Sequence, residues 1–116
     1  MNSLQEWIEK LQATDKLILV EGKKDKDALA KLGIANITTV SQKPIYQIVE
    51  KVLITKKEVI ILTDFDAEGR KLYAKLYRQF QQYGVKVDNT YRIFLMRKTR
   101  ISHIEGIASY AARSIL

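Results

Sequence analysis

The sequence predicts an α/β fold with a mostly parallel central sheet and helices on both faces. The short apolar segments 17–20 and 59–62 are typical of strands buried on both faces, and the brief β-branched segment 37–40 predicts a further strand. A stretch with apolar residues at helical spacing follows each of them. Strands that alternate with helices in this way favour parallel pairing, because each helix carries the chain back to the same end of the sheet.

The first helix is expected over residues 3–13. Ser3 and Glu6 have the spacing of a capping box, in which each side chain binds a free backbone N–H of the first turn. The apolar residues that follow are Leu4, Trp7, Ile8 and Leu11. Acidic residues outnumber Lys10 on the polar face, so we expect this helix to pack on the sheet rather than on a membrane surface.

The later helices also have recognisable ends. Gly33 and Gly84 suit helix C-termini, and Pro44 suits a first turn. The inner faces are expected to comprise Ala28, Leu29 and Leu32, then Ile45, Ile48, Val49, Val52 and Leu53, and then Leu72, Tyr73, Leu76, Phe80 and Tyr83. Residues 85–87 and 91–95 could form one further strand or two, and residues 104–115 a last helix.

Composition narrows the class of protein. A chain of 116 residues fits one domain, for which we expect a helix over 1–15 and a core over 16–110. Twenty Lys and Arg against 13 Asp and Glu give a net charge of +7, which suits either a nucleic-acid partner or simple solubility. The absence of Cys excludes disulfides and thiolate zinc sites. With no apolar run of membrane-spanning length and no signal-peptide pattern, we expect a cytoplasmic protein.

The stretch VIILTDFDAEGR delivers two aspartates to the end of a buried strand. Glu21 ends the first strand in the same way, and ligands of open parallel sheets bind at the carboxyl ends of strands. If the first and third strands are neighbours, Glu21, Asp64 and Asp66 converge. Such a cluster needs a cation or a proton to offset its repulsion, and Mg²⁺ prefers carboxylate oxygens. Alternatively, each acidic residue simply favours the start of the next helix.

LILVEGKKDKDAL and VIILTDFDAEGR together resemble the Toprim domain, the catalytic module of several topoisomerases, primases and nucleases. The resemblance implies a Rossmann-like fold that uses Mg²⁺ or Mn²⁺ in strand cleavage or nucleotidyl transfer. It makes Glu21 a general acid or base and a metal ligand, Asp64 and Asp66 catalytic metal ligands, and Glu68 the acidic residue of the DxDxEG form. Topoisomerase-like versions often carry Glu where this chain has Arg70.

The residues of the two motifs are also similar to those of the 5S ribosomal RNA maturase ribonuclease. We therefore expect a nuclease that cleaves RNA or DNA. The alternative is a non-catalytic adaptor that binds nucleic acid and protein partners within a larger processing complex. A receiver-like phosphoacceptor is a third hypothesis, although receivers place an acidic pair after the first strand and this chain has Glu21 and Gly22 there.

Basic residues surround these motifs. The candidates for phosphate binding are Lys23, Lys24, Arg70, Lys71, Lys75, Arg97, Lys98 and Arg100. Lys71, Lys75 and Arg78 lie on one helical stripe, which could equally be a solvated face. If residues 91–95 form a strand of the sheet, Arg92 and the basic residues after it would line the crevice. His103 is the single histidine and is expected to have an auxiliary role in a loop.

Overall fold

The computed structural model describes residues 1–55 and 58–115, without the side chains of residues 114 and 115. In these residues a parallel sheet of three strands has the order β2-β1-β3, with β1 at Leu17–Val20, β2 at Ile37–Thr39 and β3 at Val59–Ile61. Ile18 pairs with Ile37 on one side and with Ile60 on the other. The parallel sheet and the neighbouring positions of the first and third strands are therefore confirmed.

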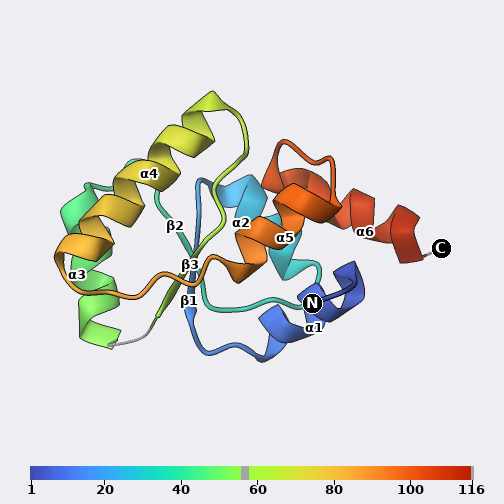
Figure 1. Cartoon of the computed structure of the whole chain (residues 1–116), viewed down its shortest axis with the longest axis horizontal. Coiled ribbons are helices and arrows are strands. Elements are labelled where there is room, and N and C mark those ends of the chain that lie inside the picture. Colours follow the sequence, from blue (N-terminus) through green and yellow to red (C-terminus); the bar gives the residue numbers. More distant parts are fainter. Residues whose placement is uncertain (56–57, 116) are drawn as a thin grey trace.

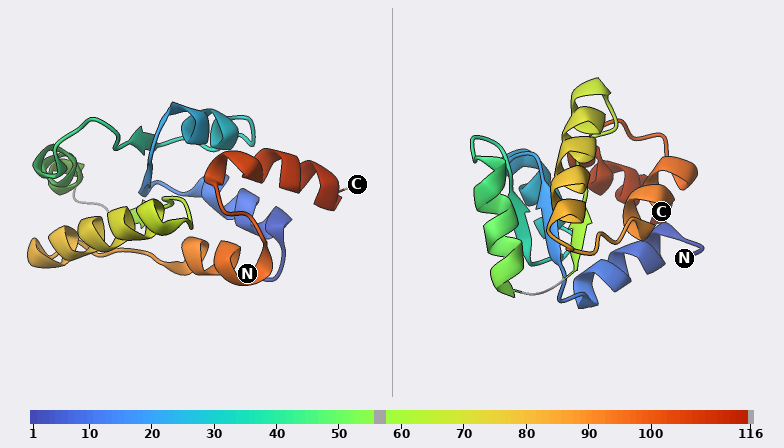
Figure 2. Two further views of the ribbon diagram at one scale, coloured as in Figure 1. Left: turned by 90° about the horizontal axis from the view of Figure 1, so that it is seen from above. Right: turned by 60° about the vertical axis from the view of Figure 1, so that its left-hand side comes forward.

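Helices cover both faces of the sheet (Figure 1). They are α1 (Leu4–Ala13), α2 (Lys23–Ala30), α3 (Ile45–Thr55), α4 (Ala67–Gln82), α5 (Thr90–Lys98) and α6 (Ile107–Ile115), with a 3₁₀ turn η1 at Ile104–Gly106. Figure 2 shows α3 and α4 on one side of the strands and α1, α2, α5 and α6 on the other. None of the helices in the described ranges is long and apolar enough to cross a membrane.

The continuous apolar sequences of the strands explain why helices cover both faces of the sheet. Ile18 and Ile60 point into a core shared with α1, α2, α5 and α6, where Trp7 is fully buried. Leu19 and Ile61 point into a second core, shared with α3 and α4, that contains Phe80. Because successive side chains of a strand face opposite sides, continuous apolar strands require a cover on both faces.

The cap at Ser3 and the two glycines at helix ends are confirmed. Ser3 Oγ accepts a hydrogen bond from the N–H of Glu6 at 3.1 Å, which caps α1. Gly33 and Gly84, which follow α2 and α4, have φ values of 78° and 70°. This left-handed conformation favours glycine, because a Cβ atom would strain it.

The prediction of a strand at residues 91–95 is wrong. This segment lies in α5, where Tyr91, Phe94 and Leu95 are buried at helical spacing. Among the described residues, the segment before it contributes only a single parallel bridge, between Val87 and Val59. A short apolar run without its neighbours does not distinguish the two periods, and here packing beneath Trp7 selects the helix.

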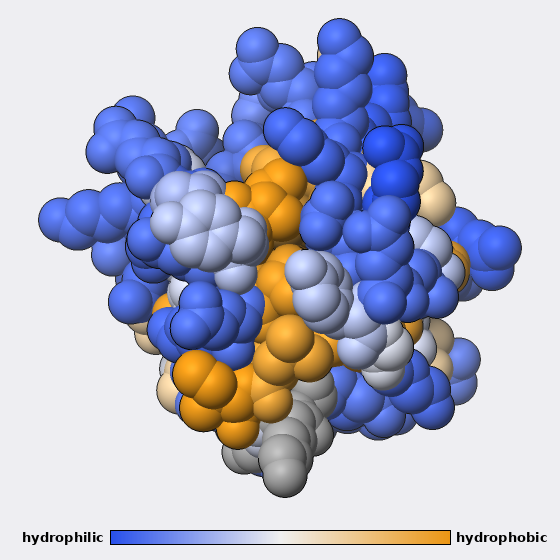
Figure 3. Space-filling view, turned by 90° about the vertical axis from the view of Figure 1, so that its left-hand side faces the viewer, coloured by the Kyte–Doolittle hydropathy of each residue, from blue (hydrophilic) through white to orange (hydrophobic). Residues whose placement is uncertain are grey.

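The inner faces of α3 and α4 are narrower than predicted. Leu53 and Tyr83 are 39% and 57% exposed, and Ile54 is 75% exposed. Figure 3 shows apolar side chains at the surface of the end of the molecule that α3 and α4 form. The side chains that α3 and α4 bury in the second core are Ile48, Val49 and Val52 of α3 and Leu76 and Phe80 of α4.

Candidate metal centre

Glu21 and Asp64 meet because β1 and β3 are adjacent. The pairing continues beyond β3, where the N–H of Leu62 donates to Leu19 O at 2.8 Å. Two residues later, the N–H of Asp64 donates to Glu21 Oε1 at 3.0 Å. The side chain of Glu21 therefore closes the gap between the two strand ends, and its carboxylate is fixed beside the aspartate loop.

Asp66 begins α4. Its Oδ1 accepts a hydrogen bond from the N–H of Gly69 at 2.8 Å, which satisfies one of the free donors of the first turn. Its Oδ2 lies 3.2 Å from His103 Nε2. The helix-start interpretation of Asp66 is thus confirmed, and it leaves one carboxylate oxygen directed at the histidine.

Gly69 holds α4 close to the aspartate loop. A Cβ atom at this position would lie 2.0 Å from the backbone oxygen of Asp64, much closer than atoms can approach. The hydroxyl of Thr63 also donates to Gly69 O at 2.8 Å. The glycine of the DxDxEG motif therefore has a steric role, since it permits the contact that places Asp64 and Asp66 together.

The loop before η1 completes the centre. Asp64 is 9% exposed, and its Oδ1 accepts a hydrogen bond from the N–H of Ile104 at 2.7 Å. The N–H of Phe65 donates to Ser102 O at 2.8 Å. These contacts bring His103 to the aspartates, so that one potential ligand atom from each of Asp64, Asp66 and His103 lies within 4.8 Å of the others.

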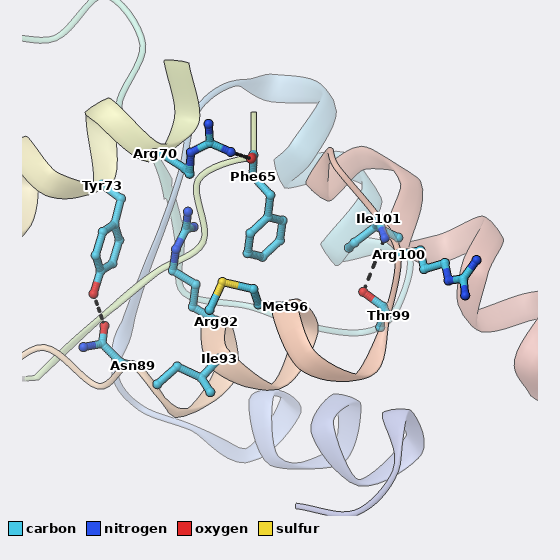
Figure 4. Close-up of a pocket in the computed structure, with 10 residues that line it drawn as sticks. All are labelled: Phe65, Arg70, Tyr73, Asn89, Arg92, Ile93, Met96, Thr99, Arg100 and Ile101. Carbon is cyan, nitrogen blue, oxygen red and sulfur yellow. Dashed lines mark hydrogen bonds between the residues drawn. The ribbon is translucent and has the colours of Figure 1, made fainter. Parts of the chain in front are cut away.

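Arg92 holds the aspartate loop through hydrogen bonds to its backbone carbonyls. Its guanidinium donates to Thr63 O, to Thr63 Oγ1 at 3.1 Å and to Asp64 O at 3.2 Å. It lies 4.6 Å from the ring centroids of both Phe65 and Tyr73, between the two rings (Figure 4). Arg92 is 7% exposed, so its charge acts from inside the protein and offsets the repulsion among the carboxylates.

Two carboxyl groups next to the aspartate loop, Glu21 and Asp25, have pKa values above the usual range. Burial raises the pKa of Glu21 above its usual value, against the effect of the Asp64 N–H, and the charges of Asp64 and Asp66 raise it further. Burial likewise raises the pKa of Asp25, which is 7% exposed and accepts from the N–H of Gly22 at 3.1 Å. Carboxylates that lose water beside one another favour a bound proton or cation.

Not every predicted ligand joins this group. Glu68, in the first turn of α4, is exposed and does not belong to the set formed by Asp64, Asp66 and His103. Glu21 also lies outside that set, although it contacts Asp64 through its hydrogen bond. His103, predicted only as an auxiliary residue, lies inside it.

The basic candidates are all exposed and occupy different sides of the centre. Arg70 donates to Phe65 O at 2.9 Å, and Lys71 and Lys75 continue along α4. Lys23 and Lys24 begin α2, directly after the Glu21 loop. Arg97 and Lys98 line a separate pocket with Met1, and Arg100 precedes the His103 loop.

Sequence reasoning missed two residues of the site. Arg92 was expected at a rim around a strand, whereas it is a buried support for Asp64. Asp25 received no role, although it lies three residues after Gly22, which is the spacing of a capping box. The helical spacing of Tyr91, Arg92 and Leu95 was the signal that Arg92 points inward.

The comparisons agree with this geometry. The profile of the Toprim domain family matches residues 16–98, which include both acidic motifs, β1, β3 and Arg92. The chain belongs to the Toprim domain family, whose fold binds divalent metals and processes nucleic acids. This membership favours the metal-centre hypothesis over the receiver-like one.

Named relatives define the group more closely. A UPF0292 protein of Methanocaldococcus jannaschii is 37% identical over 110 residues, which cover 91% of this chain and 86% of the relative. A UPF0292 protein of Pyrococcus abyssi is 39% identical over 86% of this chain and 77% of its own. A solved structure of a protein from Aquifex aeolicus has a TM-score of 0.83 and 38% identity, covering 90% of this chain and 98% of that one.

Proposed function

We propose that this chain is a nuclease that cleaves phosphodiester bonds of RNA or DNA with the help of Mg²⁺ or Mn²⁺. The observation that carries the proposal is the meeting of Asp64, Asp66 and His103 within 4.8 Å, with the Glu21 carboxylate hydrogen-bonded to the same loop. Two carboxylates and an imidazole suit a divalent cation. Carboxylates favour Mg²⁺ and Mn²⁺, and the imidazole is a better ligand for a transition metal such as Mn²⁺.

Asp64, Asp66 and His103 would hold the ion, and a bound ion would supply electrostatic stabilisation to a phosphoryl group and its leaving oxygen. Asp66 caps α4 through Oδ1 and offers Oδ2. Asp64 is fixed by Ile104 through its own Oδ1. Because each carboxylate is positioned by a backbone N–H, the ligand atoms need little rearrangement on binding.

Glu21 is suited to proton transfer. One of its oxygens accepts the N–H of Asp64, and in the described part of the chain the other has no hydrogen-bond partner. Its pKa is raised, and so lies closer to neutral pH than the pKa of an ordinary glutamate. A general base or acid works best when its pKa is near the ambient pH, so Glu21 is the group we assign to activate water or to protonate the leaving oxygen.

The surrounding charge suits a nucleic-acid substrate. Arg70 and Lys71 project from the first turns of α4, next to the aspartate loop, and Lys23 and Lys24 begin α2, next to Glu21. The chain has a net charge of +7, and these basic side chains would attract phosphates toward the carboxylates. An adaptor would need this attraction but not a glutamate poised for proton transfer, which is why we propose an enzyme.

The test combines cleavage and metal binding. The wild-type protein is incubated with Mg²⁺ or Mn²⁺ and with structured RNA, single-stranded DNA and duplex DNA. Asp64→Asn and Glu21→Gln remove the charge but keep an acceptor oxygen for the Ile104 and Asp64 N–H groups. Asp27→Asn, an exposed change of equal charge on α2, is the matched control.

We expect cleavage by the wild type and by Asp27→Asn only when metal is present, and loss of cleavage in the other two variants. Calorimetry should show weaker Mn²⁺ binding for Asp64→Asn and nearly unchanged binding for Glu21→Gln. If the wild type binds nucleic acid but cuts no substrate of the panel, the nuclease proposal is wrong and the adaptor is supported. If Glu21→Gln cuts normally, the proton-transfer role is wrong.

A further inference from the structure

A pocket of about 510 Å³ adjoins the metal centre on the side of α5 (Figure 4). Phe65 forms part of its wall and is also the residue between Asp64 and Asp66. The Cα atom of Phe65 is therefore one peptide unit, about 3.8 Å, from the Cα atom of each aspartate. The pocket therefore borders the aspartate loop through Phe65.

The pocket presents apolar side chains to solvent. Phe65 and Ile101 are half-buried, whereas Ile93 and Met96, on the outer side of α5, are 37% and 60% exposed. In Figure 4 the ring of Phe65 and the sulfur of Met96 both point toward the interior of the pocket. Exposed apolar groups that converge on a hollow, rather than scatter over a surface, indicate a binding site.

The guanidinium of Arg92 lines the pocket between Phe65 and Tyr73, and further polar groups lie at the edges of the apolar surface. The hydroxyl of Tyr73 is hydrogen-bonded to Asn89 at one end, and Thr99 Oγ1 donates to Leu95 O at the other. In Figure 4 Arg70 lies above the ring of Phe65, and its guanidinium donates to the Phe65 carbonyl. Arg100 belongs to the lining, but its guanidinium extends away from the pocket in Figure 4.

We propose that the pocket receives one unpaired nucleobase of the nucleic acid whose phosphate lies at the metal centre. A base has apolar faces and a polar edge, which match an apolar wall with hydrogen-bonding groups at its ends. Its sugar and phosphate would emerge next to Arg70 and the carboxylates. The inference rests on the proposed function and specifies its substrate: a single strand, or a duplex from which one base is turned out.

The pocket fits a base better than an apolar side chain of a protein partner. About 510 Å³ is within the usual range of small-ligand pockets, roughly 300–1,000 Å³. Tyr73 and Asn89 already bond each other, but a purely apolar occupant would cover part of the Arg70 guanidinium without offering a partner to the donors that Phe65 O does not use. A nucleotide offers hydrogen-bonding atoms at both ends of the pocket.

The chain carries its own reporter for this site. It has two methionines, Met1 and Met96, so protein labelled with ¹³C at the methionine methyl groups gives two signals. Met96 lies in the pocket, and Met1 lines a different one and serves as the internal control. The Met96 signal is assigned as the one that disappears in Met96→Leu.

The titration uses the four nucleoside 5′-monophosphates in the presence of a chelator, with ribose 5-phosphate as the compound that lacks a base. We expect at least one nucleotide to shift the Met96 methyl signal upfield in a saturable way, because the methyl lies over an aromatic face. The pocket of Met1 contains the phosphate-binding candidates Arg97 and Lys98, so any Met1 shift should be the same for the nucleotides and for ribose 5-phosphate, and ribose 5-phosphate should leave Met96 unshifted. An unshifted Met96 signal, or an equal shift by ribose 5-phosphate, overturns the proposal, as does saturation by an apolar peptide alone.

A second measurement uses binding of a single-stranded oligonucleotide to Met96→Asp. Its matched control is Ile54→Asp, an equally charged change at an exposed apolar residue of α3. One stacked base is expected to contribute roughly five- to 150-fold in affinity, so Met96→Asp should weaken binding by a factor in that range beyond the loss in the control. Equal affinities of the two variants would overturn the pocket assignment.

These tests are independent of catalysis. They require no metal, so a pocket that binds nucleotides in a protein that cuts nothing would leave this inference standing and remove the proposed nuclease. Conversely, metal-dependent cleavage by a protein whose Met96 signal never responds would keep the nuclease and remove the base pocket.

Discussion

Gly69→Ala gives a sharp test of how the metal centre is built. Glycine in a helix is ordinarily less favourable than alanine by about 1 kcal/mol, so helix propensity alone predicts that this change stabilises the protein. The structure predicts the opposite. The new Cβ atom would lie 2.0 Å from Asp64 O, 2.5 Å from Asp64 C and 2.8 Å from Asp64 Cα.

The contacted atoms belong to the backbone, so no side-chain rotation can relieve the overlap. The first turn of α4 must move away from the aspartate loop by more than 1 Å to restore an ordinary contact of about 3.5 Å. Overpacking of this kind costs roughly 1–3 kcal/mol or more. The displacement also breaks the hydrogen bond from Thr63 to Gly69 O, which is worth about 1 kcal/mol. After subtraction of the propensity gain, we expect a net loss of roughly 1–3 kcal/mol.

The assay is equilibrium unfolding by denaturant, with Gly106→Ala as the matched control. A Cβ atom at Gly106 meets nothing within 4 Å, so this variant should keep the wild-type free energy of unfolding or gain a little. Calorimetry with Mn²⁺ on the folded Gly69→Ala protein should also show weaker binding, because Asp64 and Asp66 are moved apart. A Gly69→Ala protein as stable as Gly106→Ala, with unchanged metal affinity, would refute the steric role.

Three further predictions concern charge. Folding raises the pKa of Glu21 above its usual 4.5, so protonated Glu21 stabilises the fold and this contribution is lost as pH rises through the folded-state pKa. Glu21→Gln should therefore have a larger free energy of unfolding than the wild type at neutral pH. In denaturant titrations the two free energies should converge below pH 4.5. Arg92→Met leaves the Thr63 and Asp64 carbonyls without this donor and should lose roughly 2–6 kcal/mol of unfolding free energy, whereas the exposed Arg97→Met should lose little; equal losses would contradict the supporting role. Arg70→Gln should weaken binding to every nucleic-acid sequence and lower the slope of log affinity against log salt by about 1, and an unchanged slope would place Arg70 outside the interface.

The sequence was sufficient to predict the elements whose signals are local. The apolar strands 17–20 and 59–62 can be buried only in a sheet covered on both faces, and the structure has that arrangement. The cap at Ser3 and the glycines after α2 and α4 depend on backbone geometry within a few residues, so they too could be predicted. The same reasoning placed Glu21 and Asp64 at strand ends.

Tertiary structure decided what depends on contacts between distant segments. Residues 91–95 are apolar in a way that suits a strand or a helix, and packing against Trp7 and the first core selects the helix that buries Arg92. His103 joins the aspartates only because Ile104 N–H binds Asp64, forty positions earlier in the chain. Local sequence specifies which backbone conformations are low in free energy. The position of a loop depends on hydrogen bonds and burial that form only when the chain is folded.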